Sequence, residues 1–406
     1  MRDNPKAAGF SAQKLIRLRS HLEEYYVKPQ KIPGCQILVA RRGITAFSAS
    51  LGLMDIERGK TIRDDAIFRI YSMSKPITSV ALMMLFEEGK FQLTDPVHKF
   101  IPSWAAHRVW VEGSGDAMIT RKPKNPITIQ HLLTHTAGLT YGGFLPGLEL
   151  PVDAAYAKAG ISRDTIGTLA SLAEKLAQVP LLYDPGSRWS YSLGTDICGH
   201  LVEIISGQPF NEFLKERLFE PLEMHDTDFM VPDASLDRFA ACYERAPNKS
   251  LRLEDDPETS QYRKAPSAPS GAGGLVGTIR DYANFCDMLR QKGRFKGQRL
   301  IAQTTLELMT RNHLRDSSLA KMAVGGFSET ANEGVGFGLG FASTIDAVAS
   351  GTIGEGDFYW GGLASTIFWV DPIQDLYVIF MTQLIPSTTF NFRGQIKNIV
   401  YGAIEE

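Results

Sequence analysis

The 406-residue chain has few cysteines and no excess of charge of one sign. Its four cysteines, Cys35, Cys198, Cys242 and Cys286, stand far apart and form no Cys-x-x-Cys pair, so buried free thiols are expected. Lys and Arg number 43 against 45 for Asp and Glu, which gives a net charge of −2. A chain with this balance is not expected to bind nucleic acid or an anionic membrane as its main partner.

Long apolar segments are also absent. No run approaches the ~18 apolar residues that a membrane-spanning helix needs. The N-terminal residues Met1–Lys6 lack the apolar core of a signal peptide. These two absences predict a cytoplasmic protein that does not span a membrane.

Several sequence signatures of enzymes are missing. The chain has neither the Gly-x-Ser-x-Gly pattern of α/β-hydrolases nor a Gly-x-x-x-x-Gly-Lys phosphate loop. His131 and His135 stand at a spacing that can bind zinc, but the Glu of a His-Glu-x-x-His site and a third ligand are not evident. We therefore predict structural roles for both histidines, no metal site and no cofactor.

The segment Ala66–Lys75 carries the main functional signal. A β-prone run ends at Tyr71, Ser72 and Lys75 follow, and a helix-like stretch continues to Glu88. Residues three apart on a helix share a face, so the Lys75 amine can reach the Ser72 hydroxyl. A Ser hydroxyl needs a base beside it to act as a nucleophile, and an unprotonated Lys can be that base.

The Ser-x-x-Lys pattern alone is weak evidence, because it also occurs at Ser11–Lys14 and Ser318–Lys321. Ser is a favoured residue at helix N-termini, and both of these serines precede helix-like runs. We predict that Ser11 and Ser318 cap helices. Taken alone, Ser72 fits a cap and a nucleophile equally well.

Two later segments bear on this choice. Tyr191 lies near the start of the helix-like run Thr195–Ile205, and Gly361-Gly362 precede the strand-like run Ser365–Val370. Each has an ordinary structural interpretation, a half-buried aromatic residue in the first case and a bulge or close backbone approach in the second.

Together, in this order, the three segments resemble the serine β-lactamase and penicillin-recognising superfamily. Its signature is a Ser-x-x-Lys, a Tyr-x-Asn and a Lys-Thr-Gly motif. Within it the chain looks most like the family VIII carboxylesterases, which share the fold of class C β-lactamases. The resemblance covers roughly residues 30 to 400 and extends to His131–Leu139, Pro185-Gly186 and Ser270–Val276.

The chain departs from the β-lactamase pattern in two places. Leu193 stands where the second motif has Asn, and Trp360-Gly361-Gly362 replaces Lys-Thr-Gly. Both changes remove polar groups that would hold a β-lactam, and family VIII esterases resemble this chain at both points. The departures favour an esterase.

The resemblance implies an α/β (α+β) fold with a mainly antiparallel sheet flanked by helices and an inserted helical lobe. Residues 1–85 and 240–406 would form the discontinuous α/β lobe, and residues 86–239 the helical lobe, with the active site at their junction. The patterns predict helices over residues 11–27, 170–176, 195–205, 280–292 and 392–404 and strands over residues 36–40, 44–48, 66–71, 337–344, 365–370 and 376–382. Residues 251–264 are polar and are expected to form a mobile loop.

The function that the resemblance implies is hydrolysis of short-chain acyl or aryl esters through an acyl-enzyme on Ser72. Lys75 and Tyr191 would share the general base and acid roles, and which of them is deprotonated at rest stays open. The backbone N–H groups of Ser72 and Leu363 would form the oxyanion hole.

Trp360, Gly361 and Gly362 are expected to contact the substrate, with the Trp360 ring as an apolar wall. The expected partner is a small-molecule ester, and the sequence does not predict an oligomeric state. The alternatives are a class C-type β-lactamase or D-amino-acid peptidase, an acyltransferase that uses the same acyl-enzyme, and a non-catalytic protein on this fold.

Overall fold

The computed structural model describes residues 3–143, 149–161, 167–314, 317–323 and 333–405. The sequence also predicts a Pro- and Gly-rich loop at residues 144–147 and a helix end at the glycine pair 325–326, and both segments lie outside these ranges.

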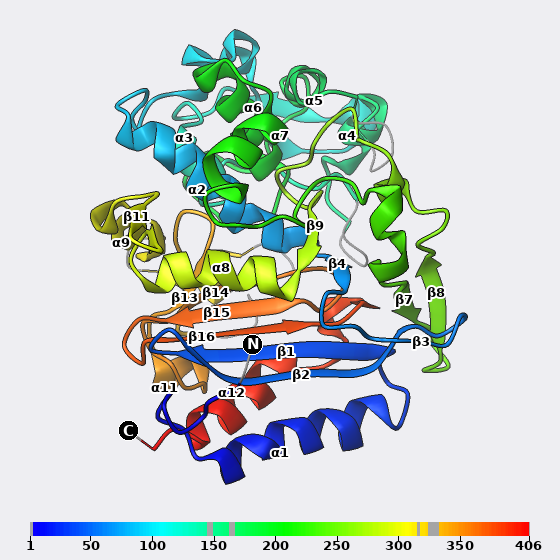
Figure 1. Cartoon of the computed structure of the whole chain (residues 1–406). Helices are drawn as coiled ribbons and strands as arrows, with labels where there is room; N and C mark the ends of the chain where they lie inside the picture. Colours follow the sequence, from blue (N-terminus) through cyan, green and yellow to red (C-terminus); the bar gives the residue numbers. More distant parts are fainter. Residues whose placement is uncertain (1–2, 144–148, 162–166, 315–316, 324–332, 406) are drawn as a thin grey trace.

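An eight-stranded antiparallel sheet organises the chain, in the order β12-β13-β14-β15-β16-β1-β2-β3 (Figure 1). Strands from the two ends of the sequence meet in it, because β1 pairs with β16. The bounds are β1 Gly34–Arg41, β2 Ile44–Asp55, β3 Lys60–Thr61, β12 Val335–Phe337, β13 Ala342–Thr344, β14 Phe358–Gly361, β15 Ile367–Asp371 and β16 Leu376–Met381. The predicted antiparallel sheet is confirmed.

Helices cover both faces of this sheet, which explains why every residue of β1, β15 and β16 is buried. Helices α1 (Ala12–Leu22) and α12 (Phe392–Gly402) lie on one face, and α8 (Ile279–Arg290) lies on the other (Figure 1). Helix α1 continues into a π-helical turn at Glu23–Val27, so the predicted helix over residues 11–27 is confirmed.

Beyond α8 lies a layer of helices (Figure 1). They are α2 (Ser74–Glu87), α3 (Ile129–Leu133), α4 (Asp153–Lys158), α5 (Leu169–Leu176), α6 (Gly194–Ser206) and α7 (Phe210–Leu214). Helix α2 is buried on nearly all sides, as its apolar sequence requires. The division into lobes 1–85 plus 240–406 and 86–239 stays a prediction.

Two short sheets complete the scaffold around the candidate site. Strand β4 (Ile67–Arg69) pairs with β9 (Val276–Thr278), which brings the segment before Ser72 beside the segment after Gly274. Strands β7 (Cys242–Arg245), β8 (Leu251–Asp255) and β17 (Leu384–Ile385) form a three-stranded sheet.

The prediction of a mobile loop over residues 251–264 is wrong at its first half, which is strand β8. Asp255 at the end of β8 accepts a 2.5 Å hydrogen bond from the buried guanidinium of Arg69. A buried cation needs such a partner, so this pair fixes the segment against β4. The polar composition of the segment reflects this ion pair and alternating exposure.

Three smaller predictions also need correction. Residues 337–344 form a hairpin between β12 and β13, because Gly340 adopts a left-handed conformation (φ 91°) that turns the chain. Ser11 and Ser318 stand at the N-cap positions of α1 and of the short helix α10 (Leu319–Met322), but neither side chain makes a capping hydrogen bond.

The four cysteines are buried and free, as predicted. Within the described ranges, every helix is too short or too polar to cross a bilayer.

Candidate active site

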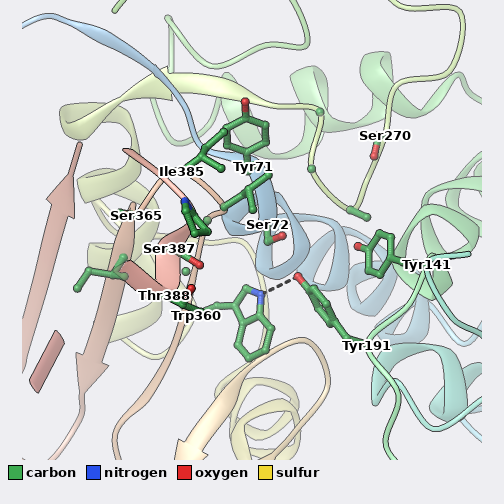
Figure 2. A pocket seen from close by; sticks show the side chains of 18 of the residues that line it. Tyr71, Ser72, Tyr141, Tyr191, Ser270, Trp360, Ser365, Ile385, Ser387 and Thr388 are labelled. Carbon is green, nitrogen blue, oxygen red and sulfur yellow. Dashed lines mark hydrogen bonds between the residues drawn. The ribbon is translucent and has the colours of Figure 1, made fainter. Parts of the chain in front are cut away.

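A cavity of about 1150 Å³ lies between the helical layer and the end of β14. Its walls include Ser72, Tyr141, Tyr191 and the segment Trp360–Leu363. Figure 2 shows the side chains of Ser72, Tyr191 and Trp360 pointing toward one another. The structure therefore brings the three predicted segments together around one space.

A tight turn between β4 and α2 presents Ser72 to the cavity. Residues Tyr71–Met73 form a 3₁₀ turn, and Tyr71 has a left-handed φ of 42°, which is a strained conformation for a residue with a side chain. Neighbouring hydrogen bonds hold the turn: the Ser74 hydroxyl donates to the Tyr71 carbonyl at 2.6 Å, and Ile70 N–H donates to the Leu275 carbonyl at 3.1 Å.

The amine of Lys75 lies at the centre of the site. It is in the first turn of α2 and only 1% exposed. Its Nζ atom lies 3.2 Å from Ser72 Oγ, 2.8 Å from the Tyr141 hydroxyl and 2.7 Å from the Ala272 carbonyl oxygen. Burial lowers the pKa of Lys75 to about 7, against an opposing effect of the Asp196 carboxylate. A large share of this amine is therefore neutral at pH 7.

Tyr191 precedes α6 and is almost completely buried. Its hydroxyl accepts a hydrogen bond from Trp360 Nε1 at 3.4 Å (Figure 2) and also interacts with the hydroxyls of Ser72 and Tyr141. Lys75 Nζ lies 4.5 Å from the centre of its ring. Burial raises the pKa of Tyr191 above its ordinary value of 10.0, so this phenol stays protonated at neutral pH.

Aromatic packing fixes the Tyr191 ring. The Trp189 ring stacks on it at 5.9 Å with an interplanar angle of 11°, and the His135 ring meets it edge-on at 4.9 Å. His135 is buried and lies 3.2 Å from Ser192 Oγ through Nδ1, and burial lowers its pKa well below 6.5. His135 is thus a neutral packing residue.

The other histidine of the candidate zinc pair also has a structural contact. His131 Nδ1 accepts the Thr128 N–H at 3.1 Å and completes the N-terminal cap of α3. The described residues contain no cluster of three His, Cys, Asp or Glu side chains that could hold a metal ion.

The glycine pair permits a close approach of two backbones. A Cβ atom at Gly362 would lie 2.4 Å from the Ile70 carbonyl oxygen and 2.3 Å from Thr366 Oγ1. Ile70 belongs to the segment that presents Ser72, so Gly362 brings the end of β14 against the Ser72 turn. At Gly361 the nearest atoms would lie at 3.1 Å or more, which is less restrictive.

Ser72 and Leu363, whose backbone N–H groups are expected to form the oxyanion hole, both line this cavity. Within the described part of the chain, the backbone N–H groups of Ser72 and Leu363 make no hydrogen bond. Trp360 is buried, and its carbonyl accepts a hydrogen bond from Arg393 Nη2 at 3.0 Å. The guanidinium of Arg393 also lies 4.3 Å from the Tyr359 ring centre, so a cation lies beside β14.

Sequence reasoning missed two side chains of this site, Tyr141 and Asp196. Tyr141 follows the segment His131–Leu139, and Asp196 lies five residues after Tyr191. Neither belongs to a motif, and only the folded arrangement brings them to Lys75. The segment Ser270–Val276, which the sequence analysis used only as part of the family resemblance, supplies the Ala272 carbonyl that accepts a hydrogen bond from the Lys75 amine.

The chain belongs to the β-lactamase family, because residues 20–395 match the family model described as Beta-lactamase. Protein Rv1367c of Mycobacterium tuberculosis is 33% identical over 341 residues, which cover 83% of this chain and 82% of that protein. Esterase EstB of Burkholderia gladioli is 29% identical over 394 residues, 93% of either chain. Among solved structures, EstCE1, "a hydrolase with promiscuous acyltransferase activity", has a TM-score of 0.79 at 28% identity and covers 96% of this chain and 99% of its own.

Proposed function

We propose that this protein is a serine carboxylesterase that forms an acyl-enzyme on Ser72. The observation that carries the proposal is the 3.2 Å contact between Lys75 Nζ and Ser72 Oγ at the wall of a large cavity. The similarity to EstB, whose name is esterase, and to EstCE1, described as a hydrolase, supports the same activity.

In the acylation step, neutral Lys75 accepts the Ser72 proton while Ser72 Oγ attacks the ester carbonyl carbon. The Ala272 carbonyl can only accept, so Lys75 donates one of its protons there and keeps its lone pair available for Ser72. The N–H groups of Ser72 and Leu363 stabilise the negative carbonyl oxygen of the tetrahedral intermediate.

Collapse of this intermediate requires a proton for the leaving alcohol. Tyr191 is the donor, because its phenol stays protonated and interacts with the Ser72 hydroxyl. Tyr141 contacts both Lys75 and Tyr191, so the proton taken from Ser72 returns to Tyr191 through Tyr141. Water then attacks the acyl-enzyme, and the same groups return a proton to Ser72.

The substrate is a small-molecule ester with a short acyl or aryl group beside Trp360. The indole ring supplies an apolar wall, and its N–H holds the Tyr191 hydroxyl in place. Gly361 lies on the same cavity wall, and Gly362 brings the backbone before Leu363 against the turn that presents Ser72. The active site would then lie at the junction of the two predicted lobes.

Comparing two substrates on one preparation tests this proposal against a β-lactamase or D-amino-acid peptidase. The kcat/KM for p-nitrophenyl butyrate should exceed that for nitrocefin by at least about tenfold. The reason is that Leu193 and Trp360 replace polar groups that would bind a β-lactam.

Arg393 lies close enough to β14 to bind the carboxylate of nitrocefin, so Arg393→Ala should lower the nitrocefin rate more than the ester rate. A nitrocefin value equal to or above the ester value contradicts the carboxylesterase function.

Acyl transfer to an alcohol is the second candidate. The cavity volume of about 1150 Å³ exceeds the usual range for a single small ligand, so an acceptor fits beside the acyl group. The description of EstCE1 includes acyltransferase activity. Product analysis with a vinyl ester and added alcohols separates the two outcomes, because a transferase yields the new ester where an esterase yields the acid.

A further inference from the structure

Asp196 is a buried carboxylate next to the proposed catalytic residues. It lies in the first turn of α6, is 1% exposed and accepts hydrogen bonds from Ser270 Oγ at 2.6 Å and from Ala272 N–H at 3.1 Å. Burial raises the pKa of this carboxyl above its ordinary value, while the two hydrogen bonds and the nearby Lys75 favour its ionised form. Burying a carboxylate costs free energy unless hydrogen bonds compensate for it. The two donors provide such compensation, which indicates that the carboxylate has a role at this position.

These contacts connect Asp196 to Lys75 through one turn of the chain. Ala272 donates its N–H to Asp196, and its carbonyl accepts from Lys75 Nζ at 2.7 Å. The neighbouring Gly271 carbonyl accepts from Thr78 Oγ1, one turn after Lys75 on α2, at 2.8 Å. The turn Ser270–Ala272 is therefore clamped between α6 and α2, and Asp196 supplies the α6 side.

Asp196 also acts on Lys75 by its charge. The other titratable groups that face the amine are Tyr141, Tyr191 and His135, and burial favours the neutral form of all three. Burial also raises the pKa of Asp196, but its hydrogen bonds and the nearby Lys75 oppose this effect, and the ionised carboxylate favours the ammonium form of Lys75. That form is the one Lys75 takes after it accepts the Ser72 proton.

We propose that Asp196 is a positioning residue for the Lys75 base: it anchors the turn that orients the amine toward Ser72 and stabilises the ammonium ion that forms during acylation. This inference rests on the proposed function only in that Lys75 acts as the base. Because Asp196 is only 1% exposed, we assign its effect to the turn and to Lys75.

The test compares Asp196→Asn with Asp196→Ala. The Asn side chain keeps an oxygen for Ser270 and Ala272 but removes the charge. The acid limb of the pH profile of kcat/KM should then move to lower pH by on the order of one unit, because the neutral amine persists to lower pH. In Asp196→Ala the turn is released as well, so kcat should be on the order of tenfold lower than in Asp196→Asn, with little change in KM.

Asp281 provides a matched control. It is also a buried carboxylate in the first turn of a helix, α8, and it accepts from Thr227 Oγ1 at 2.9 Å and Asp226 N–H at 2.7 Å. Asp281→Asn should reduce thermal stability as Asp196→Asn does, yet leave the acid limb where it is in the wild type. An acid limb that coincides in Asp196→Asn and the wild type contradicts the role of Asp196, even if Asp196→Ala fails to fold.

The same variants should be labelled with a fluorophosphonate across the pH range, because labelling of Ser72 reports its activation without any ester turnover. If the labelling profile shifts in Asp196→Asn but the wild type hydrolyses no ester, the carboxylesterase function is contradicted and the role of Asp196 is supported. Ester hydrolysis with an unshifted labelling profile contradicts the Asp196 inference alone.

Discussion

The Nζ atom of Lys75 lies 2.8 Å from the hydroxyl oxygen of Tyr141, a residue 66 positions further along the chain. Tyr141 also interacts with the Tyr191 hydroxyl, so it connects the proposed base with the proposed acid. In the proposed mechanism, this connection is the route by which the proton taken from Ser72 reaches Tyr191.

Replacing Tyr141 by Phe tests the connection. The variant should keep its fold but lose kcat by on the order of 10²-fold, because a positioned proton-transfer group is removed. Tyr262→Phe is the control, since Tyr262 lines the same cavity from the segment after β8. Steady-state kinetics with p-nitrophenyl butyrate decides: a wild-type kcat in Tyr141→Phe rules out the proton path through this residue.

Much of this site was predictable from local sequence. Ser72, Lys75 and Tyr191 stand beside helix starts and strand ends whose patterns are visible in the sequence, and the structure brings the three together. Tyr141 and Asp196 were not predictable in this way, because their partners come from distant segments. No local pattern encodes the 2.7 Å contact between the Ala272 carbonyl and Lys75.

The same limit applies to the fold. The polar sequence of strand β8 is typical of a loop. Its polar residues pair with residues far away in the sequence, as Asp255 does with Arg69, and no local pattern shows this. Ser11 and Ser318 carry the Ser-x-x-Lys pattern and stand at helix starts, but neither side chain caps its helix. The spacing of the motif therefore did not separate Ser72 from the other two serines. The burial of the lysine does, because Lys75 is buried whereas Lys14 and Lys321 are exposed.

The low pKa of Lys75 predicts a pH-dependent cost in stability. Its pKa is about 7 in the folded chain and 10.5 for the ordinary group, so the unfolded state binds more protons between these values. The destabilisation is complete below about pH 7 and disappears as the pH rises toward 10.5. Lys75→Met should therefore be more stable than the wild type at pH 6, by on the order of a few kcal/mol, with a smaller difference at pH 9.

Urea unfolding of both proteins at the two pH values measures this difference. Groups that titrate in both proteins cancel in the comparison. A stability difference between Lys75→Met and the wild type that grows from pH 6 to pH 9 has the wrong sign and contradicts the proposed neutral amine.

The two glycines after Trp360 should differ in their tolerance to alanine. Gly362→Ala places a methyl group 2.4 Å from the Ile70 carbonyl oxygen, so the backbone at Ser72 or at Leu363 has to move. The variant should lose roughly 1–3 kcal/mol of stability and most of its activity. Gly361→Ala meets its nearest atom at 3.1 Å and should be milder in both respects. Thermal melts and kcat for the pair provide the measurement, and equal losses would count against the close approach at Gly362.

The most direct test of the central claim is the identity of the residue that becomes covalently modified. The protein is incubated with a fluorophosphonate and digested, and the adduct is located by peptide mass spectrometry. If Ser72 is the nucleophile, one adduct is expected, on Ser72, with no labelling or ester hydrolysis in a folded Ser72→Ala variant, while Ser11→Ala and Ser318→Ala behave as the wild type. An adduct on another serine, or ester hydrolysis that survives in Ser72→Ala, would contradict this role of Ser72.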